Sequence, residues 1–125
     1  MPKVSDDDRL ADMLQFAREV AQLTEGRTRR DLGQDRVLEL ALTRLLELIG
    51  EAARAVSPET RQRLPEVPWG QIVGMRNRLI HGYRRLDLSV IWRTARKDIP
   101  PLMEQLQAAL SGSDEQESNP DGPLR

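Results

Sequence analysis

The sequence RVLELALTRLLELIGEAARAV, residues 36–56, has the most regular apolar pattern in the chain. Its apolar residues recur at intervals of three and four, the spacing that brings side chains to one face of an α-helix. The stripe consists of Leu38, Ala41, Leu42, Leu45, Leu48, Ile49, Ala52 and Val56. Leu46 and Ala53 widen the stripe, so this helix should be buried on two sides. The pattern predicts a long central helix over residues 33–56.

The segments beside the central helix also carry helix signals. Ser5 and Asp8 have the spacing of a capping box, and the apolar stripe that follows them should end near Gly26. Residues 26–33 are polar and are expected to form a connection. Ser57-Pro58 has the pattern of an N-cap followed by proline at the first helical position, which predicts a short helix.

Two more helices are expected in the C-terminal half. The first should begin at about residue 68 and end at Gly82, because glycine is the usual residue just beyond a helix C-terminus. The second should begin with Asp87 or Ser89 as its cap. Pro100-Pro101 removes two backbone donors, so we expect the fourth helix to be kinked there.

These patterns predict an all-α fold, an antiparallel four-helix bundle. No internal repeat, alternating strand pattern or glycine-rich phosphate loop is present in the sequence. The expected domain covers residues 1–110. Residues 111–125 are rich in Ser, Gly, Pro, Asp and Glu, so we expect a disordered C-terminal tail.

Composition restricts the chemistry. The chain of 125 residues has no cysteine and one histidine, which excludes disulfides, thiolate metal sites and a multi-histidine zinc site within one chain. We expect no metal ion and no cofactor. No apolar run approaches the roughly 20 residues that a membrane span needs, and the acidic N-terminus is unlike a signal peptide. The expected location is the cytoplasm, without membrane contact.

The net charge of −1 conceals an uneven distribution. Residues 61–97 hold nine Arg or Lys against two acidic residues, a balance of +7, whereas the tail 111–125 has a balance of −3. A basic middle between acidic ends favours a local anion site. The alternative is a solvated helix face in which arginine serves helix propensity.

Four residues with suitable chemistry lie within eight positions: Arg76, Asn77, His81 and Tyr83. Histidine is the side chain best suited to proton transfer near neutral pH, and arginine offers a planar fork of donors to a phosphate. These residue types are sufficient for RNA cleavage without a metal ion. His81 would take the proton from a ribose 2′-hydroxyl, and Arg76 would stabilise charge on the phosphate, leaving 2′,3′-cyclic phosphate and 5′-hydroxyl ends.

Helix geometry leaves the contact between the two residues open. On a regular helix Arg76 and His81 are roughly 140° apart, whereas Asn77 and His81 are neighbours. Either the Arg76 side chain wraps round the helix, or the helix loosens before Gly82, or the site is shared across a two-fold axis between two subunits.

Each residue also has an ordinary structural interpretation. His81 could cap helix carbonyls, and Tyr83 could be a core or interface residue. Arg76 could be an ion-pair partner of Glu47 or Glu51 on the central helix. The cluster taken alone does not decide between these roles and catalysis.

The run Arg76-x-x-x-x-His81-x-Tyr83 resembles the R-x4-6-H signature of HEPN ribonucleases, in the R-x4-H-x-Y form of HepT-like toxins. Residues 47–52, 65–69, 74–77, 91–92 and 98–100 also resemble that family, in the same order. The resemblance covers residues 5–110, which makes it far more specific than the short motif. One departure is Arg84-Arg85, where family members often have an aromatic residue after the tyrosine.

The resemblance implies a four-helix bundle that forms a homodimer, with the motifs of both subunits lining one composite active-site cleft. It implies a toxin of a type VII-like toxin–antitoxin pair, a metal-independent endoribonuclease with Arg76 and His81 catalytic and Asn77 supporting the site. The implied partner is an MntA-like minimal nucleotidyltransferase antitoxin that transfers AMP to Tyr83. Bulk and negative charge two residues from His81 would block the cleft and repel RNA phosphate.

Two alternatives stay open at this point. The chain could be a catalytically silent HEPN subunit that binds a nucleotidyltransferase as an adaptor. It could also be a structural helical dimer without a role in nucleic-acid chemistry, in which case His81→Ala would change stability at most.

Overall fold

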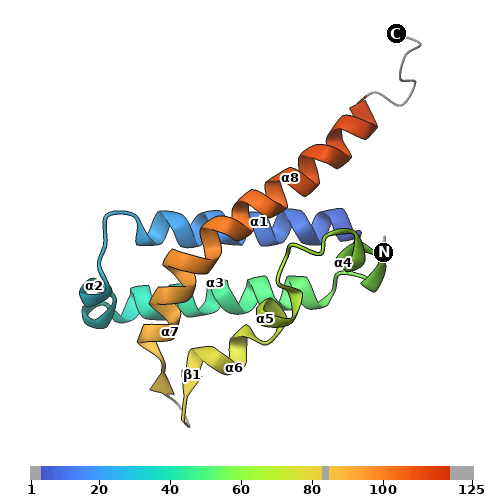
Figure 1. Cartoon of the computed structure of the whole chain (residues 1–125). Coiled ribbons are helices and arrows are strands. Elements are labelled where there is room, and N and C mark those ends of the chain that lie inside the picture. The colour runs from blue at the N-terminus through green and yellow to red at the C-terminus, as the bar shows by residue number, and fades with distance from the viewer. Residues whose placement is uncertain (1–3, 83–84, 119–125) are drawn as a thin grey trace.

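The computed structural model describes residues 4–82 and 85–118 of the chain. The helices α1 (Asp6–Thr24) and α3 (Arg36–Arg54), of 19 residues each, pack side by side and run in opposite directions (Figure 1). A continuous helical rod at the C-terminal end, residues 88–118, crosses this pair. The short helices α5 (Trp69–Val73) and α6 (Met75–Leu79) pack on α3. They form the fourth member of the helical bundle, beside α1, α3 and the C-terminal rod. The predicted all-α class is confirmed.

Both α1 and α3 have a side-chain cap at the N-terminus, and the sequence predicted the one on α1. The Ser5 hydroxyl accepts from Asp8 N–H while the Asp8 carboxylate accepts from Ser5 N–H, which is the predicted capping box. Asp35 caps α3 by accepting from Leu38 N–H at 3.0 Å. The short helix α4 (Pro58–Arg63) begins after Ser57, as predicted.

One element between α1 and α3 differs from the expected polar connection. A helix of six residues, α2 (Arg29–Gln34), occupies most of it. Thr28 and Asp31 form a second capping box, and Leu32 is fully buried against the rest of the core. This single apolar anchor fixes a segment that otherwise carries charged side chains on its surface.

The third predicted helix is not continuous. It is split at Gly74 into α5 and α6, and it ends at Leu79 instead of running to Gly82. Gly82 has a positive φ of 67°, so glycine is required in a turn and not as a helix terminator. The expectation that Asn77 and His81 are neighbours on one helix is therefore wrong.

A two-stranded antiparallel ribbon follows α6, although the sequence showed no strand pattern. It consists of β1 (Ile80–His81) and β2 (Arg85–Leu86), with Ile80 opposite Leu86 and His81 opposite Arg85. The ribbon is closed at its base because Asp87 N–H donates to Leu79 O at 2.7 Å. Asp87 then caps the next helix, as predicted, by accepting from Val90 N–H.

The last helical rod comprises α7 (Leu88–Arg93), a π-helical turn over Thr94–Asp98 and α8 (Ile99–Ser118). The irregularity thus lies one turn before Pro100-Pro101, and both prolines sit in the first turn of α8. A proline cannot donate to the carbonyl four residues back and its ring crowds that carbonyl. The widened turn, in which Ile99 N–H donates to Thr94 O, relieves this conflict without a break in the helix.

The end of α8 also differs from the expected boundary. We expected the helical domain to end at residue 110, whereas α8 continues to Ser118. The remainder of the predicted tail, residues 119–125, lies outside the described residues.

The core is a single aliphatic cluster shared by all the long helices. Its fully buried side chains include Met13, Leu42, Leu46, Ile49, Leu79, Ile91, Ile99 and Leu106. In the part of the chain that the structure describes, no helix combines the length and the apolar character of a membrane span.

Candidate active site

His81 lies on β1 and not on a helix, and its side chain is exposed to solvent. Because α6 ends two residues earlier, the helix does loosen before Gly82, one of the three possibilities left open by the sequence, but this does not bring Arg76 to the hollow beside His81. Within the described residues the imidazole makes no hydrogen bond, so it caps no helix carbonyl there. The ordinary structural role considered for His81 therefore has no support in the geometry.

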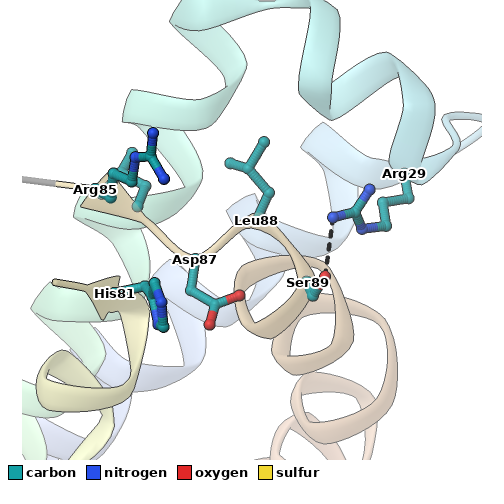
Figure 2. Close-up of a pocket in the computed structure, with 7 residues that line it drawn as sticks. Arg29, His81, Arg85, Asp87, Leu88 and Ser89 are labelled. Atoms are coloured by element: carbon teal, nitrogen blue, oxygen red, sulfur yellow. Dashed lines mark hydrogen bonds between the residues drawn. The ribbon is translucent and has the colours of Figure 1, made fainter.

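His81 lines an open hollow of about 320 Å³ between the ribbon and α2 (Figure 2). The lining residues are Arg29, His81, Arg85, Leu86, Asp87, Leu88 and Ser89. Figure 2 shows His81 and Arg85 on the two strands and Arg29 beside Ser89 across the hollow. Three nitrogen-bearing side chains thus line one open hollow, with one carboxylate among them.

Arg76 occupies a different surface. It lies on α6 with its side chain 72% exposed, and its Nε is 3.5 Å from Glu47 Oε2 on α3. It does not line the hollow beside His81. The ion pair considered from the sequence is thus present, between an exposed guanidinium and a carboxylate that is only 19% exposed.

The structure does not test the roles expected for Asn77 and Tyr83. Asn77 lies on α6 with an exposed side chain, and its backbone N–H donates to Gly74 O at 3.2 Å. Nothing in the described part of the chain joins its amide to His81, so its expected supporting role stays a prediction. Tyr83 lies outside the described residues, between β1 and β2 in the sequence.

Two arginines at the hollow were not among the site residues predicted from the sequence. Arg85 was counted only as part of the basic middle, and Arg29 lies 52 positions before His81. The capping box Thr28–Asp31 could have predicted α2, but no local pattern places α2 beside the ribbon. Among the described residues no group of three His, Asp or Glu side chains has the arrangement of a metal site.

The family model described as "Ribonuclease HepT-like" matches residues 13–109. The chain belongs to the HepT-like ribonuclease family. A protein of Thermococcus cleftensis named "Probable ribonuclease HepT" is 34% identical over 100 residues, which cover 80% of this chain and 91% of that protein. No solved structure matches the chain.

Two further HepT-like relatives carry RNase in their names. One, from Caldanaerobacter subterraneus subsp. tengcongensis, is 38% identical over 101 residues, covering 81% of this chain and 90% of the relative. The other, from Methanocaldococcus jannaschii, is 33% identical over 98 residues, covering 78% and 90%. The part matched by the family model begins within α1, ends within α8 and includes the ribbon and the whole motif from Arg76 to Tyr83.

Proposed function

We propose that this HepT-like protein is an endoribonuclease that cleaves RNA without a metal ion. The observation that carries the proposal is the exposed His81 at a hollow flanked by two arginines, in a chain whose family is named for ribonuclease activity. His81 takes the proton from a ribose 2′-hydroxyl, and the 2′-oxygen attacks the adjacent phosphorus. The bond to the 5′-oxygen breaks, and that oxygen receives a proton from an acid. Arg76 stabilises the charge on the phosphate.

The arrangement within one chain supports a shared site. Arg76 points to α3 while His81 faces the hollow on the other side of the ribbon. A two-fold axis would bring the motif of one subunit to that of the other and would supply a second histidine as the acid. A homodimer with a composite cleft would therefore bring Arg76 of one subunit to His81 of the other. It would also supply the acid that protonates the 5′-oxygen.

The surface next to Arg76 suits contact with a second copy. Val37 and Leu40 on α3 are 76% and 49% exposed, and Ile80 on the ribbon is 39% exposed. Val37, Leu40, Arg44, Glu47 and Glu51 follow each other at intervals of three and four, so they share one exposed face of α3. This face is apolar at one end and reaches the Arg76 ion pair at the other. Sedimentation of Leu40→Glu should show a monomer, and the exposed control Gln62→Glu should keep the dimer.

The test of the catalytic proposal is RNA cleavage in EDTA by the wild type, Arg76→Ala and His81→Ala. The wild type should leave 2′,3′-cyclic phosphate ends. Loss of a general acid or base should lower the rate by roughly 10²- to 10⁴-fold while the thermal unfolding profile is unchanged. Equal cleavage by the variants, or an inert wild type with every RNA offered, would instead favour a catalytically silent adaptor of a nucleotidyltransferase.

The regulatory part of the proposal is a toxin–antitoxin pair. A cognate nucleotidyltransferase would neutralise the toxin by transferring AMP to Tyr83, which lies two positions after His81. Co-expression with the partner should add one AMP to the wild type and none to Tyr83→Phe, which should stay toxic. Normal modification and neutralisation of Tyr83→Phe would remove this step and leave the ribonuclease proposal standing.

A further inference from the structure

Arg29 is brought to the His81 hollow by a contact between segments that are 60 positions apart. Its Nη2 donates to Ser89 Oγ at 2.9 Å, which links α2 to the first turn of α7. The buried Leu32 fixes α2 against the core, and α2 packs along α7. The guanidinium is thus held at one side of the hollow, opposite the ribbon that carries His81 and Arg85 (Figure 2).

The two arginines of the hollow differ in electrostatic surroundings from several others. Arg27, Arg36, Arg44 and Arg76 each lie within 3.8 Å of a carboxylate oxygen. Within residues 4–82 and 85–118, neither Arg29 nor Arg85 has such a partner. Two guanidinium groups that share one open space, and that form no ion pair within those residues, attract an anion. They are free to bind it without first losing an ion pair.

The one carboxylate that lines the hollow is already engaged. Asp87 Oδ1 accepts from Val90 N–H at 3.2 Å as the cap of α7. This role ties the carboxylate to the helix terminus, and its single charge stands against the two guanidinium groups of the hollow. The Ser89 hydroxyl adds a neutral polar group at the floor, so cationic and hydrogen-bonding groups dominate the lining.

We propose that this hollow binds the phosphate of the nucleotide next to the cleaved linkage in single-stranded RNA. Arg29 is the anchoring donor, oriented by Ser89, and Arg85 is the second donor. A guanidinium presents paired N–H groups to phosphate oxygens, and this pairing fixes position as well as charge. The open hollow of about 320 Å³ has room for a phosphate and its attached sugar. This inference rests on the proposed function. It predicts that the RNA substrate passes over α2.

The experiment measures binding and cleavage separately, with Arg29→Gln and the control Arg30→Gln. Arg30 is the next residue on α2, is also exposed, and does not line the hollow. The binding probe is a 2′-O-methyl RNA oligonucleotide, which cannot be cleaved through its 2′-oxygen. Fluorescence anisotropy at several salt concentrations gives the affinity and the slope of log K against log salt.

Arg29→Gln should weaken binding by roughly 5- to 20-fold at low salt and reduce the slope by about 0.7, the value for one single-strand phosphate contact. In cleavage it should raise KM and leave kcat nearly unchanged. Ser89→Ala should have a smaller effect in the same direction, and Arg30→Gln almost none.

Equal losses in Arg29→Gln and Arg30→Gln, or no loss in either, would overturn the phosphate site, as would a wild type that does not bind the oligonucleotide. These outcomes are distinct from failure of the proposed function. A protein that binds through Arg29 but never cleaves RNA would retain the site and lose the ribonuclease mechanism.

Discussion

The helices α1 and α3 and the segment 64–87 are held in place by different means. Each of the two helices has 19 residues, a side-chain cap at its N-terminus and an apolar stripe in the core. The segment 64–87 contains two helices of five residues whose N-termini have no side-chain cap, followed by strands of two residues. Helices this short are not stable alone. The segment that carries the motif therefore depends on α3 for its conformation.

The contacts that hold this segment are few and specific. The Trp69 indole N–H donates to Leu64 O at 3.0 Å, and the Arg61 guanidinium lies 5.7 Å from the Trp69 ring centre. Gly50 on α3 lets the α5 backbone approach closely. The site is thus positioned by packing on α3, so changes on α3 should reach His81 through α5 and α6.

Gly50→Ala should disturb the packing of this segment on α3 more than any other substitution described below. A Cβ at residue 50 would lie 3.0 Å from the backbone oxygen of Ile72, which cannot rotate away as a side chain can. Overpacking of this kind costs about 1–3 kcal/mol in the free energy of unfolding, and the displaced α5 should also lower RNA cleavage. Urea unfolding and cleavage of one RNA substrate measure the two effects.

Gly70→Ala is the matched control within the segment itself. A Cβ at Gly70 meets no atom within 4 Å, and the residue lies inside α5. This change should be neutral or stabilise the protein by up to about 1 kcal/mol, with cleavage retained. If Gly50→Ala is as stable and as active as Gly70→Ala, the segment does not depend on close packing against α3.

Asp6→Asn should have a smaller effect on stability, because it acts at the start of α1 and not in the segment 64–87. The Asp6 carboxylate accepts from the hydroxyls of Ser57 and Thr60 and from Ser57 N–H, so it joins the start of α1 to the start of α4. The Ser57 hydroxyl, with that of Thr60, holds the pKa of Asp6 below its ordinary value of 3.8. The substitution should cost on the order of 1 kcal/mol at neutral pH, because the site is open to solvent, and should leave cleavage unchanged.

The pH dependence follows from the direction of this shift. A lowered pKa in the folded state means that the stability from Asp6 is present above pH 3.8 and is lost as the pH falls through the folded value. The stability difference between the wild type and Asp6→Asn should therefore shrink between pH 5 and pH 2, as measured by urea unfolding. Asp7→Asn, an exposed first-turn control, tests whether the helix dipole alone explains the loss. A difference that is constant over this pH range would contradict the role given to the carboxylate.

Sequence patterns were sufficient for the parts of the fold that carry their own signals. The apolar stripes of α1 and α3, the Ser5–Asp8 capping box, the Ser57-Pro58 start and the Asp87 cap are local features, and each was predicted. The break at Gly74 was not, because the apolar spacing from Trp69 to Leu79 is compatible with one continuous helix. The contact of α5 with Gly50 is a tertiary property that no single window of sequence contains.

The candidate site was predictable in residue types but not in arrangement. The motif named Arg76 and His81, yet strands of two residues carry no periodicity, so the place of His81 on β1 could not be predicted. The nearness of Arg29 depends on how α2 folds back on α7, over 60 positions of sequence. Long-range packing of this kind decides which charged residues share a surface.

The most direct test of the central claim uses two RNA oligonucleotides that differ at one sugar. The wild-type protein in EDTA is given an RNA that it cleaves at a single linkage, and the same RNA with 2′-deoxyribose on the 5′ side of that linkage. We expect a 2′,3′-cyclic phosphate end from the unmodified RNA and no cut at the modified linkage of the deoxy-substituted RNA. Cleavage of the deoxy-substituted linkage, or a product with a 5′-phosphate, would contradict attack by the 2′-oxygen and with it the role assigned to His81.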